Sequence, residues 1–576
     1  MPPPAPATRL LAPDDDLVVA LRDLPAGSRQ VVAPGEVVAL ADAVPAKQKF
    51  ARRRLGDGER ARMYGVTVGR AVGAIGAGSL LTTANLAQAT DPLPAAGGAG
   101  AAPSWTAPAL PPDLPRTFAG YKRADGSVGV ANLYLVVPLV FCENRNVGVL
   151  REALEGPLGF GPGAGPRFDL TALANAYRAG AGADELAGLD VADAGDRGGD
   201  ARARVFPHVD GLRFLTHEAG CGGTRADGAR LVELLAGYLT HPNVAGATVL
   251  SLGCQNAQVA LLLEALERRG AAPRPDAERG GVRSFGYARD RRLVVAEQQA
   301  GTEGEGAFLG EALRQTFAAL AVADGARRAE APVAALTLGL ECGGSDGFSG
   351  LTANPLLGRV SDWLVGLGGA SLLAEFPELH GVEAELLRRC ERPADAARFR
   401  SLMRAYGEAA ARVGSGFADN PSPGNIREGL LTDAMKSAGA ARKAGAAPVS
   451  GVLDYAEPLA RRGLHLLCTP GNDVESTTAL AGSGAQVIAF TTGLGTPTGN
   501  PVAPVLKLAS NSRLAAEQAD VIDFDAGGVL AAADGLDAAA AALWRRLVAT
   551  ASGTYVTAAT RLRQFDFIPW RRDISL

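Results

Sequence analysis

The sequence has little of what marks secreted, membrane-spanning or nucleic-acid-binding proteins. Its 576 residues include only six cysteines, spread widely along the chain, so a disulfide framework is not expected. No apolar run approaches the roughly 20 residues of a membrane helix, and the Pro/Ala-rich start lacks the basic segment and apolar core of a signal peptide. The 57 Lys and Arg residues are matched by 61 Asp and Glu residues, which leaves no basic excess for nucleic acid. We therefore expect a cytoplasmic protein without a membrane or nucleic-acid partner.

The sequence does contain enough apolar material for several domains. Hydrophobic residues make up 47% of the chain and charged residues 20%, a balance typical of globular proteins. Changes in composition predict a disordered tail at 1–12, a β-rich unit at 13–89, a Pro/Ala/Gly linker at 90–116, and two subdomains at 117–328 and 329–576. In the β-rich unit, strands are expected at 17–21, 37–40 and 71–75, between Gly, Pro and Asp turns.

The larger second part alternates between two kinds of segment. Short apolar runs typical of buried parallel strands occur at 132–140, 245–252, 334–340, 370–375, 464–468 and 486–491. Helix-like segments lie between them, for example at 226–238, 257–268 and 354–367. This alternation predicts a layered α/β fold with mainly parallel sheets, joined to the small β-rich domain in front of it.

Three cysteines share one local setting. Each follows a predicted strand or a short apolar stretch, beside glycine, in a loop that leads to a helix: Cys221 in T-H-E-A-G-C-G-G-T, Cys254 in S-L-G-C-Q-N and Cys342 in G-L-E-C-G-G-S-D-G. Ligands of open α/β sheets bind at the carboxyl ends of strands, and thiolates there could ligate iron or an iron–sulfur cluster. The alternative is that each cysteine is a small residue in a tight space. Cys142 is a fourth candidate of the same kind.

The loops after these strands are rich in hydroxyl and amide groups. Ser345, Ser349 and Thr352 could bind a carboxylate or hydroxyls beside a helix N-terminus, and Asp346 could ligate a metal or hold a hydroxyl. An ordinary helix-capping loop has the same composition. The loops at 469–478 and 491–500 also offer many donors and acceptors, which suits a polyhydroxy substrate. Gly-rich loops suit phosphate as well. However, the chain has no Walker motif and no convincing dinucleotide fingerprint, so no nucleotide cofactor is expected.

Two side chains are candidates for proton transfer. Of the five histidines, only His217 lies in a Gly/Cys motif, where it could act as a general base or a metal ligand. A structural role is the alternative. Lys507 follows the Gly/Thr loop and could pair with a carboxylate or act as a base.

Together these motifs resemble the altronate/galactarate dehydratase family. The resemblance covers about residues 117–552 and is most specific in the run G-G-S-D-G-F-S-G-L-T-A-N-P at 343–355. It is also carried by G-Y-K-R-A-D-G-S-V-G at 120–129, the three Gly/Cys motifs, H-P-N at 241–243, P-G-N at 423–425, T-P-G at 469–471 and F-T-T-G at 490–493. The β-rich unit resembles the SAF domain that accompanies this catalytic part.

The chain departs from the family pattern at three places. The end of the SAF-like unit, at 78–86, has no histidine where some members carry one. Leu494 stands where several members have arginine, a natural carboxylate clamp, and Asn500 stands where some have cysteine. These departures bear on the substrate more than on the type of reaction.

The resemblance implies metal-dependent elimination of water from a sugar acid, which gives a 2-keto-3-deoxy acid. A Lewis-acid metal would assist removal of the C2 proton or departure of hydroxide. On this hypothesis Cys221, Cys254 and Cys342 border or ligate iron, as Fe²⁺ or an iron–sulfur centre, and His217 or Lys507 transfers the proton. The substrate, a small-molecule sugar acid, is expected to contact Ser345, Asp346, Thr352, Asn354, Asn472 and Thr496. Two alternatives remain: a sulfo-lyase acting on a sulfonated hydroxy acid, and an inactive sugar-acid-binding homologue. A homo-oligomer is compatible with the sequence.

Overall fold

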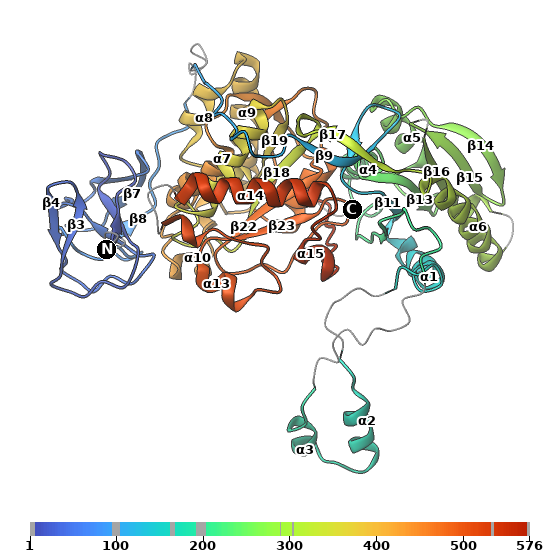
Figure 1. The fold of residues 1–576 in the computed structure, drawn as a ribbon, viewed down its shortest axis with the longest axis horizontal. Helices are drawn as coiled ribbons and strands as arrows, with labels where there is room; N and C mark the ends of the chain where they lie inside the picture. Colours follow the sequence, from blue (N-terminus) through green and yellow to red (C-terminus); the bar gives the residue numbers. More distant parts are fainter. Residues whose placement is uncertain are drawn as a thin grey trace.

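A computed structural model describes residues 6–94, 104–161, 168–191, 203–288, 290–301, 304–530 and 535–572. The described chain forms an N-terminal domain, a middle domain and a C-terminal domain. In Figure 1 the C-terminal domain lies between the N-terminal domain on the left and the middle domain on the right. None of the helices in these ranges is both long and apolar enough to cross a membrane.

The N-terminal domain consists of short antiparallel strands in three small sheets, ordered β1-β2-β5, β3-β4 and β6-β7-β8. The strands are β1 Thr8–Arg9, β2 Leu17–Ala20, β3 Arg29–Ala33, β4 Glu36–Ala39, β5 Lys49–Ala51, β6 Arg60–Met63, β7 Val66–Ala71 and β8 Leu86–Ala87. Its main core is continuous with apolar side chains of the C-terminal domain, among them Leu430 and Met435. The N-terminal domain therefore docks on the C-terminal domain of its own chain.

The middle domain has a six-stranded sheet of order β12-β11-β13-β16-β15-β14, in which β15 is antiparallel to both of its neighbours and the other pairs are parallel. One apolar core, containing residues of α4 and α5, lies on one side of this sheet, and a second, with residues of α1 and α6, lies on the other. The strands are β11 Leu133–Pro138, β12 Gly211–Phe214, β13 Val244–Ser251, β14 Arg274–Arg279, β15 Val282–Tyr287 and β16 Arg291–Glu297. The helices are η1 Phe141–Glu143, α1 Asn144–Leu154, α2 Thr171–Arg178, α3 Ala183–Ala187, α4 Arg225–Leu239, α5 Val259–Arg268, η2 Gln298–Ala300 and α6 Glu305–Ala323.

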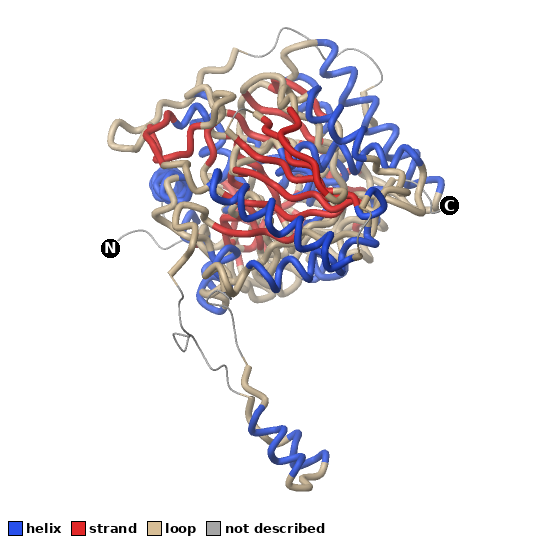
Figure 2. The backbone as a smooth tube through the Cα atoms, turned by 90° about the vertical axis from the view of Figure 1, so that its right-hand side faces the viewer, coloured by secondary structure: helices blue, strands red, loops and turns tan. Residues whose placement is uncertain are grey.

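The C-terminal domain is a seven-stranded, wholly parallel sheet of order β20-β21-β19-β18-β22-β23-β24. Its strands are β18 Thr337–Cys342, β19 Ala370–Leu373, β20 Val449–Leu453, β21 Gly463–Leu467, β22 Val487–Thr492, β23 Val505–Ala509 and β24 Phe524–Asp525. Its longer helices are α7 Ala353–Gly366, α8 Glu383–Arg389, α9 Pro393–Arg412, α11 Asp433–Ala440, α12 Asp473–Gly482 and α14 Gly535–Ala551. The shorter ones are η3 Val333–Ala335, η4 Phe376–Leu379, η5 Phe417–Asp419, α10 Pro423–Arg427, η6 Ala441–Ala444, α13 Ser512–Glu517, η7 Gly527–Leu530 and α15 Ala558–Arg561. In Figure 2 the side of the molecule that carries the middle domain faces the viewer, and helices lie around its strands.

A third, small sheet links the two larger domains. It consists of β9 Thr117–Lys122, β10 Val128–Gly129 and β17 Arg328–Pro332, in the order β10-β9-β17. The polar stretch 325–332 that suggested a boundary is therefore partly a strand. Strand β17 lies between the middle and C-terminal domains in sequence. Its pairing partner β9 lies at the start of the middle domain.

The α/β class with mainly parallel sheets is confirmed, and each of the six strands expected in the second part overlaps an observed strand. Two expectations for the first part are wrong. Thr8–Arg9 pairs with β2, so this part of the predicted tail belongs to a sheet, whereas residues 1–5 lie outside the described residues. The strand expected at 71–75 is β7, which ends at Ala71. In the expected linker, residues 95–103 lie outside the described residues, while Leu110 and Leu114 are buried in the C-terminal core.

Candidate functional site

The carboxyl end of the central strand β18 carries a buried group of ionisable side chains. Cys342 is the last residue of β18, and its Sγ lies 3.3 Å from Glu375 Oε2 and 3.0 Å from Glu378 Oε2. The Nζ of Lys443 donates to Cys342 Sγ at 2.6 Å and to Glu375 Oε2 at 2.9 Å. Lys436 Nζ pairs with Glu378 Oε1 at 2.6 Å. We call these five residues the Cys342 cluster.

The elements of the C-terminal domain bring this cluster together. Glu375 and Glu378 follow the neighbouring strand β19, at the start of η4 and within it. Lys436 lies on α11 and Lys443 on η6, which packs against α7. The carboxyl edge of a parallel sheet is where α/β proteins bind ligands, so the cluster lies where the fold is expected to place a site.

Burial and mutual charge set the protonation of the cluster. Burial, together with the carboxylates of Glu375 and Glu378, raises the pKa of the Cys342 thiol well above its usual value. Burial also raises the pKa of Glu375, with Glu378 adding to the effect. Burial acts to raise the pKa of Glu378 too, but the ammonium groups of Lys436 and Lys443 outweigh it and lower that pKa. Burial acts to lower the pKa of Lys443, yet the adjacent Cys342 sulfur and the Glu375 and Glu378 carboxylates raise it well above the usual range. The two glutamates and the two lysines therefore compensate one another.

Glu375 is strained and incompletely bonded. Its backbone is left-handed, with φ of +67°, a conformation that costs a non-glycine residue of the order of 1–3 kcal/mol. Its side chain is fully buried, and its Oε1 has no hydrogen-bond partner among the described residues. Buried polar atoms almost always have partners, and such strain is found mainly at functional sites. Both observations indicate that Glu375 is held ready for a ligand.

The donor set of the cluster fits a metal ion. The ligand atoms of Cys342, Glu375 and Glu378 all lie within 4.8 Å of one another. Beside them, burial and the charge of Glu375 raise the pKa of Glu341 well above its usual value. With Glu341 and Cys342 protonated, two carboxylates face two ammonium groups. A divalent cation that displaced both protons would leave this group neutral.

The three cysteines predicted to ligate iron do not lie together in the structure. Cys221 and Cys254 are exposed and lie in neighbouring loops, where the Asn256 N–H donates to the Gly220 carbonyl at 2.9 Å. Those loops follow β12 and β13 of the middle sheet, whereas Cys342 ends β18 of the other sheet. The two exposed sulfurs are not part of the group around Cys342. Similar local motifs therefore sit on two different sheets.

His217 is placed where it supports the fold. It is 5% exposed, its Nε2 lies 2.8 Å from the Pro138 carbonyl, and its Nδ1 accepts from the Ala219 N–H at 3.1 Å. Both ring nitrogens are thus used by the backbone, and burial lowers the pKa of His217 to about 4. The geometry favours the structural alternative, so we do not include His217 in the proposed site.

Most of the predicted substrate contacts hold the loop after Cys342 in place. Asp346 accepts hydrogen bonds from the side chains of Ser349 and Ser510 at 2.9 and 2.7 Å. Thr352 Oγ1 donates to the carbonyls of Phe348 and Ser510, Asn354 Nδ2 donates to that of Gly439, and Asn425 Nδ2 donates to that of Ser345. Asn472 is exposed and caps α12, and the half-buried Thr496 lies beside Gly344. Of the six, Asn472 and Thr496 are the most accessible.

Asp473 is a residue that the sequence reasoning passed over. A Cβ at Gly343 would lie 2.1 Å from Asp473 Oδ2, so only glycine allows this carboxyl to approach the loop. Burial, with the charges of Glu375 and Glu378, raises the pKa of Asp473 to about 7. The sequence feature that could have indicated Asp473 is its position in the first turn of a helix, directly after the T-P-G-N loop.

The predicted base Lys507 donates a hydrogen bond to Gln564 Oε1 at 2.6 Å, and burial lowers the pKa of Lys507 to about 8.

The N-terminal domain contributes a lysine to the same loop. Lys47 Nζ lies 3.1 Å from Asp346 Oδ2 and 2.5 Å from Glu428 Oε2, and its backbone φ is +72°. Gly347 and Gly429 both approach the Lys47 carbonyl so closely that a Cβ on either would clash with it. A strained lysine thus fixes the docked domain to the loop that follows Cys342.

We expect Lys47→Met to loosen this docking. The buried Asp346 carboxylate would lose its ammonium partner, which costs about 2 kcal/mol, and kcat/KM should fall about tenfold as the loop becomes less ordered. Chemical denaturation and steady-state rates measure both effects. Lys122→Met, at an exposed lysine on β9, is the matched control. Equal stability and rates in the two variants would show that the docking does not depend on Lys47.

Fold and site together define a class of protein: a multidomain α/β enzyme whose small β-rich domain docks beside a buried thiol–carboxylate–lysine centre. Three family models match the chain in order. They are the altronate/galactarate dehydratase SAF domain at residues 8–89, the D-galactarate dehydratase/altronate hydrolase second domain at 120–321, and the D-galactarate/altronate dehydratase C-terminal domain at 333–575.

Curated relatives agree with these matches. An altronate dehydratase of Bacillus subtilis (strain 168) is 34% identical over 72% of this chain and 69% of its own length. An altronate dehydratase of Escherichia coli (strain K12) is 32% identical over 90% of this chain and 89% of its own. The (2R)-sulfolactate sulfo-lyase subunit beta of Chromohalobacter salexigens is 27% identical over 77% of this chain and 94% of its own length. The chain therefore belongs to the altronate/galactarate dehydratase family, a family of sugar-acid dehydratases (carbon–oxygen hydro-lyases), and the resemblance seen in its motifs is confirmed.

Proposed function

We propose that the chain removes water from an altronate- or galactarate-like sugar acid at the Cys342 cluster and forms a 2-keto-3-deoxy acid. The observation that carries this proposal is the buried Cys342–Glu375–Glu378 donor set with its two lysines at the carboxyl end of β18. Such a site offers strong electrostatic stabilisation in a low-dielectric setting. The altronate dehydratases among the relatives support an aldonate substrate.

Cys342, Glu375 and Glu378 are the residues that would hold a divalent metal. Their mixed sulfur and oxygen donors suit a transition metal such as Fe²⁺ better than Mg²⁺ or Ca²⁺. When bound, the metal would act as a Lewis acid toward a carboxylate or hydroxyl oxygen of the substrate. This assignment replaces the ligand set of three cysteines, because Cys221 and Cys254 lie in loops of the other sheet.

The chain's own residues can carry the proton transfers. The Asp473 carboxylate would take the C2 proton, for which a pKa near neutrality is well suited. The electron pair left at C2 forms the C2–C3 double bond as the C3–O bond breaks. Lys507 would return a proton to the departing oxygen, so that water leaves. The resulting enol becomes the 2-keto acid when C3 gains a proton.

The substrate's polar groups can be met by accessible side chains around this edge of the sheet. Asn472 and Thr496 offer an amide and a hydroxyl, whereas Ser345, three residues after Cys342, is buried. Leu494, 38% exposed beside Gly344, offers no charge at the position where several family members have arginine. We therefore propose that the lysines of the cluster, and not an arginine at 494, bind the substrate carboxylate. The cytoplasmic location and a homo-oligomeric state remain predictions.

Asp473→Asn tests the proton-transfer step. We expect kcat/KM to fall by at least 10²-fold, the usual contribution of a general base. Asp473 is competent when deprotonated, so the kcat/KM of the unaltered chain should rise with pH through the Asp473 pKa of about 7. This limb should be absent from the residual activity of the variant. Asp520→Asn, at an exposed position, is the control. A variant with an unchanged rate and pH profile would remove Asp473 from the mechanism.

A product assay tests the reaction itself. The chain is incubated with Fe²⁺ and a panel of aldonates and aldarates, and 2-keto-3-deoxy product is measured by thiobarbiturate or semicarbazide. We expect product from at least one sugar acid. The sulfo-lyase alternative has a relative in its favour, and sulfite release from a sulfonated hydroxy acid without any dehydration would establish it. Sugar-acid binding without turnover would establish the inactive homologue.

A further inference from the structure

A cavity of about 470 Å³ lies between the middle and C-terminal domains, away from the Cys342 cluster. One wall comes from β11 and β12, and the opposite wall comes from the loop before β23, the end of α14, and α15. None of the five cluster residues lines it. Its volume falls in the range of sites for small organic ligands.

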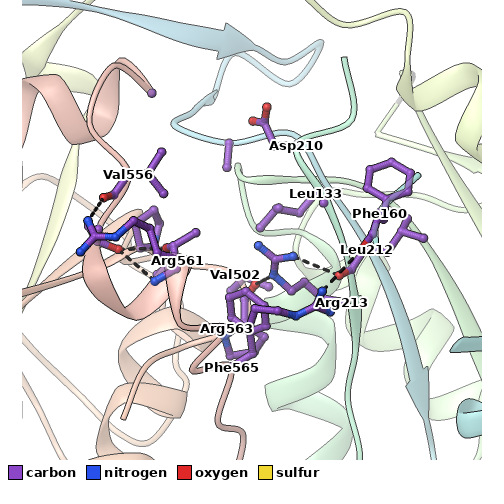
Figure 3. Close-up of a pocket in the computed structure, with 18 of the residues that line it drawn as sticks. Leu133, Phe160, Asp210, Leu212, Arg213, Val502, Val556, Arg561, Arg563 and Phe565 are labelled. Atoms are coloured by element: carbon purple, nitrogen blue, oxygen red, sulfur yellow. Dashed lines mark hydrogen bonds between the residues drawn. The ribbon is translucent and has the colours of Figure 1, made fainter. Parts of the chain in front are cut away.

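The cavity is lined by an excess of positive charge. Among its described lining residues, two are carboxylates, Glu155 and Asp210. Against these stand five arginines: Arg204, Arg213, Arg328, Arg561 and Arg563. Figure 3 shows Arg213 and Arg563 side by side near Phe565, with Arg561 on the other wall.

The two carboxylates do not neutralise these arginines. Glu155 pairs with Arg563, and Asp210 lies 3.5 Å from Arg328. The other three donate to backbone carbonyls: Arg213 to Pro501 at 2.9 Å, Arg561 to Val556 at 3.1 Å and Arg204 to Val209 at 3.3 Å. A carbonyl orients a guanidinium but does not cancel its charge. Positive charge therefore accumulates on both walls.

The guanidinium of Arg213 is buried and lies near the positive charge of Arg563. Burial, together with the nearby charge of Arg563, lowers the pKa of Arg213 to about 9. Its guanidinium lies 3.8 Å from the ring centre of Phe565, which fixes its plane. Arginines oriented in this way favour bidentate contacts with carboxylate or phosphate groups.

Apolar side chains from both domains also line the cavity. Leu133 and Leu212 contribute from the middle domain, and Val502 and Val556 from the C-terminal domain (Figure 3). Such a lining favours an organic skeleton over a bare inorganic ion.

We propose that this cavity is a binding site for a small organic anion with two or more carboxylate or phosphate groups. The ligand would contact Arg213 of the middle domain and Arg561 of the C-terminal domain together, and so join the two domains. This site is separate from the reaction centre, and the proposal does not depend on the proposed function.

The test uses the full chain, citrate and pyrophosphate as probes, and glycerol as an uncharged control, with calorimetry and thermal unfolding as readouts. We expect at least one anion to bind with a Kd below about 1 mM and to raise the unfolding temperature, while glycerol does neither. Binding of citrate alone indicates a polycarboxylate, and binding of pyrophosphate alone indicates a phosphorylated ligand.

Arg561→Gln and Arg204→Gln should each weaken this binding about tenfold, the usual loss for one charge-assisted contact. Arg412→Gln, at an exposed arginine on α9, should leave it unchanged. Unfolding temperatures without ligand establish that the variants are folded. Cys342→Ala should bind the anion normally even though it is inactive, which separates this site from the reaction centre. No binding at 10 mM of either anion, or equal binding by both pocket variants and the control, would overturn the proposal.

Discussion

Glu375→Gln is expected to lower kcat/KM for sugar-acid dehydration by about 10³-fold and to abolish stoichiometric metal binding. The amide is almost isosteric with the carboxylate, but it is a poor metal ligand and cannot pair with Lys443. A loss of this size corresponds to about 4 kcal/mol of transition-state stabilisation, within the several kcal/mol that a Lewis-acid centre supplies. Steady-state kinetics and elemental analysis of the purified protein measure the two effects.

Glu385→Gln is the matched control, since Glu385 lies nearby on α8 with a 51% exposed side chain. The glutamine variant at 375 leaves the buried Lys443 without its carboxylate partner, which also lowers stability, so equilibrium unfolding of the variant is measured beside its rates and metal content. If Glu375→Gln kept its metal and lost less than tenfold in rate, the reaction centre would have to lie elsewhere.

Lys443→Met is expected to destabilise the chain by about 3–5 kcal/mol, the usual effect of removing one partner from a buried ion pair. Lys443 is 1% exposed and bonds both Cys342 Sγ and Glu375 Oε2. Without its ammonium group, the carboxylates of the cluster lose half of their compensating charge. Equilibrium unfolding in urea gives the change in free energy, with Lys122→Met as the control.

A double variant refines this second expectation. If Cys342 and Lys443 act as one unit, Cys342→Ala combined with Lys443→Met should cost less than the sum of the two single changes. Additive costs, or a Lys443→Met chain as stable as the unaltered one, would contradict the view that the cluster is a charge-balanced unit.

The hydrophobic pattern of the sequence was sufficient for the architecture of the second part. Runs such as 245–252 and 486–491 are short, apolar on both faces and separated by helical segments, and this pattern is typical of buried parallel strands. The position of Cys342 at a strand end was predictable for the same reason. The N-terminal domain was harder, because its strands are only two to six residues long and turns determine where they end.

The partners of Cys342 were not predictable from local pattern. Glu375 and Lys443 are 33 and 101 residues away in sequence, and only the order of strands in the sheet brings them together. The one local signal is A-E-F-P-E at 374–378, which places two carboxylates just past a predicted buried strand. The structural role of His217 was not predictable, because its ring contacts the backbone carbonyl of Pro138. A contact with a backbone atom does not depend on a particular residue type in the sequence.

The measurement that tests the central claim most directly is anomalous diffraction at the iron absorption edge from crystals of the Fe²⁺-loaded, active chain. We expect one strong peak within bonding distance of Cys342 Sγ and of carboxylate oxygens of Glu375 and Glu378. A peak beside Cys221 and Cys254, with none at Cys342 in crystals of a fully active preparation, would contradict it.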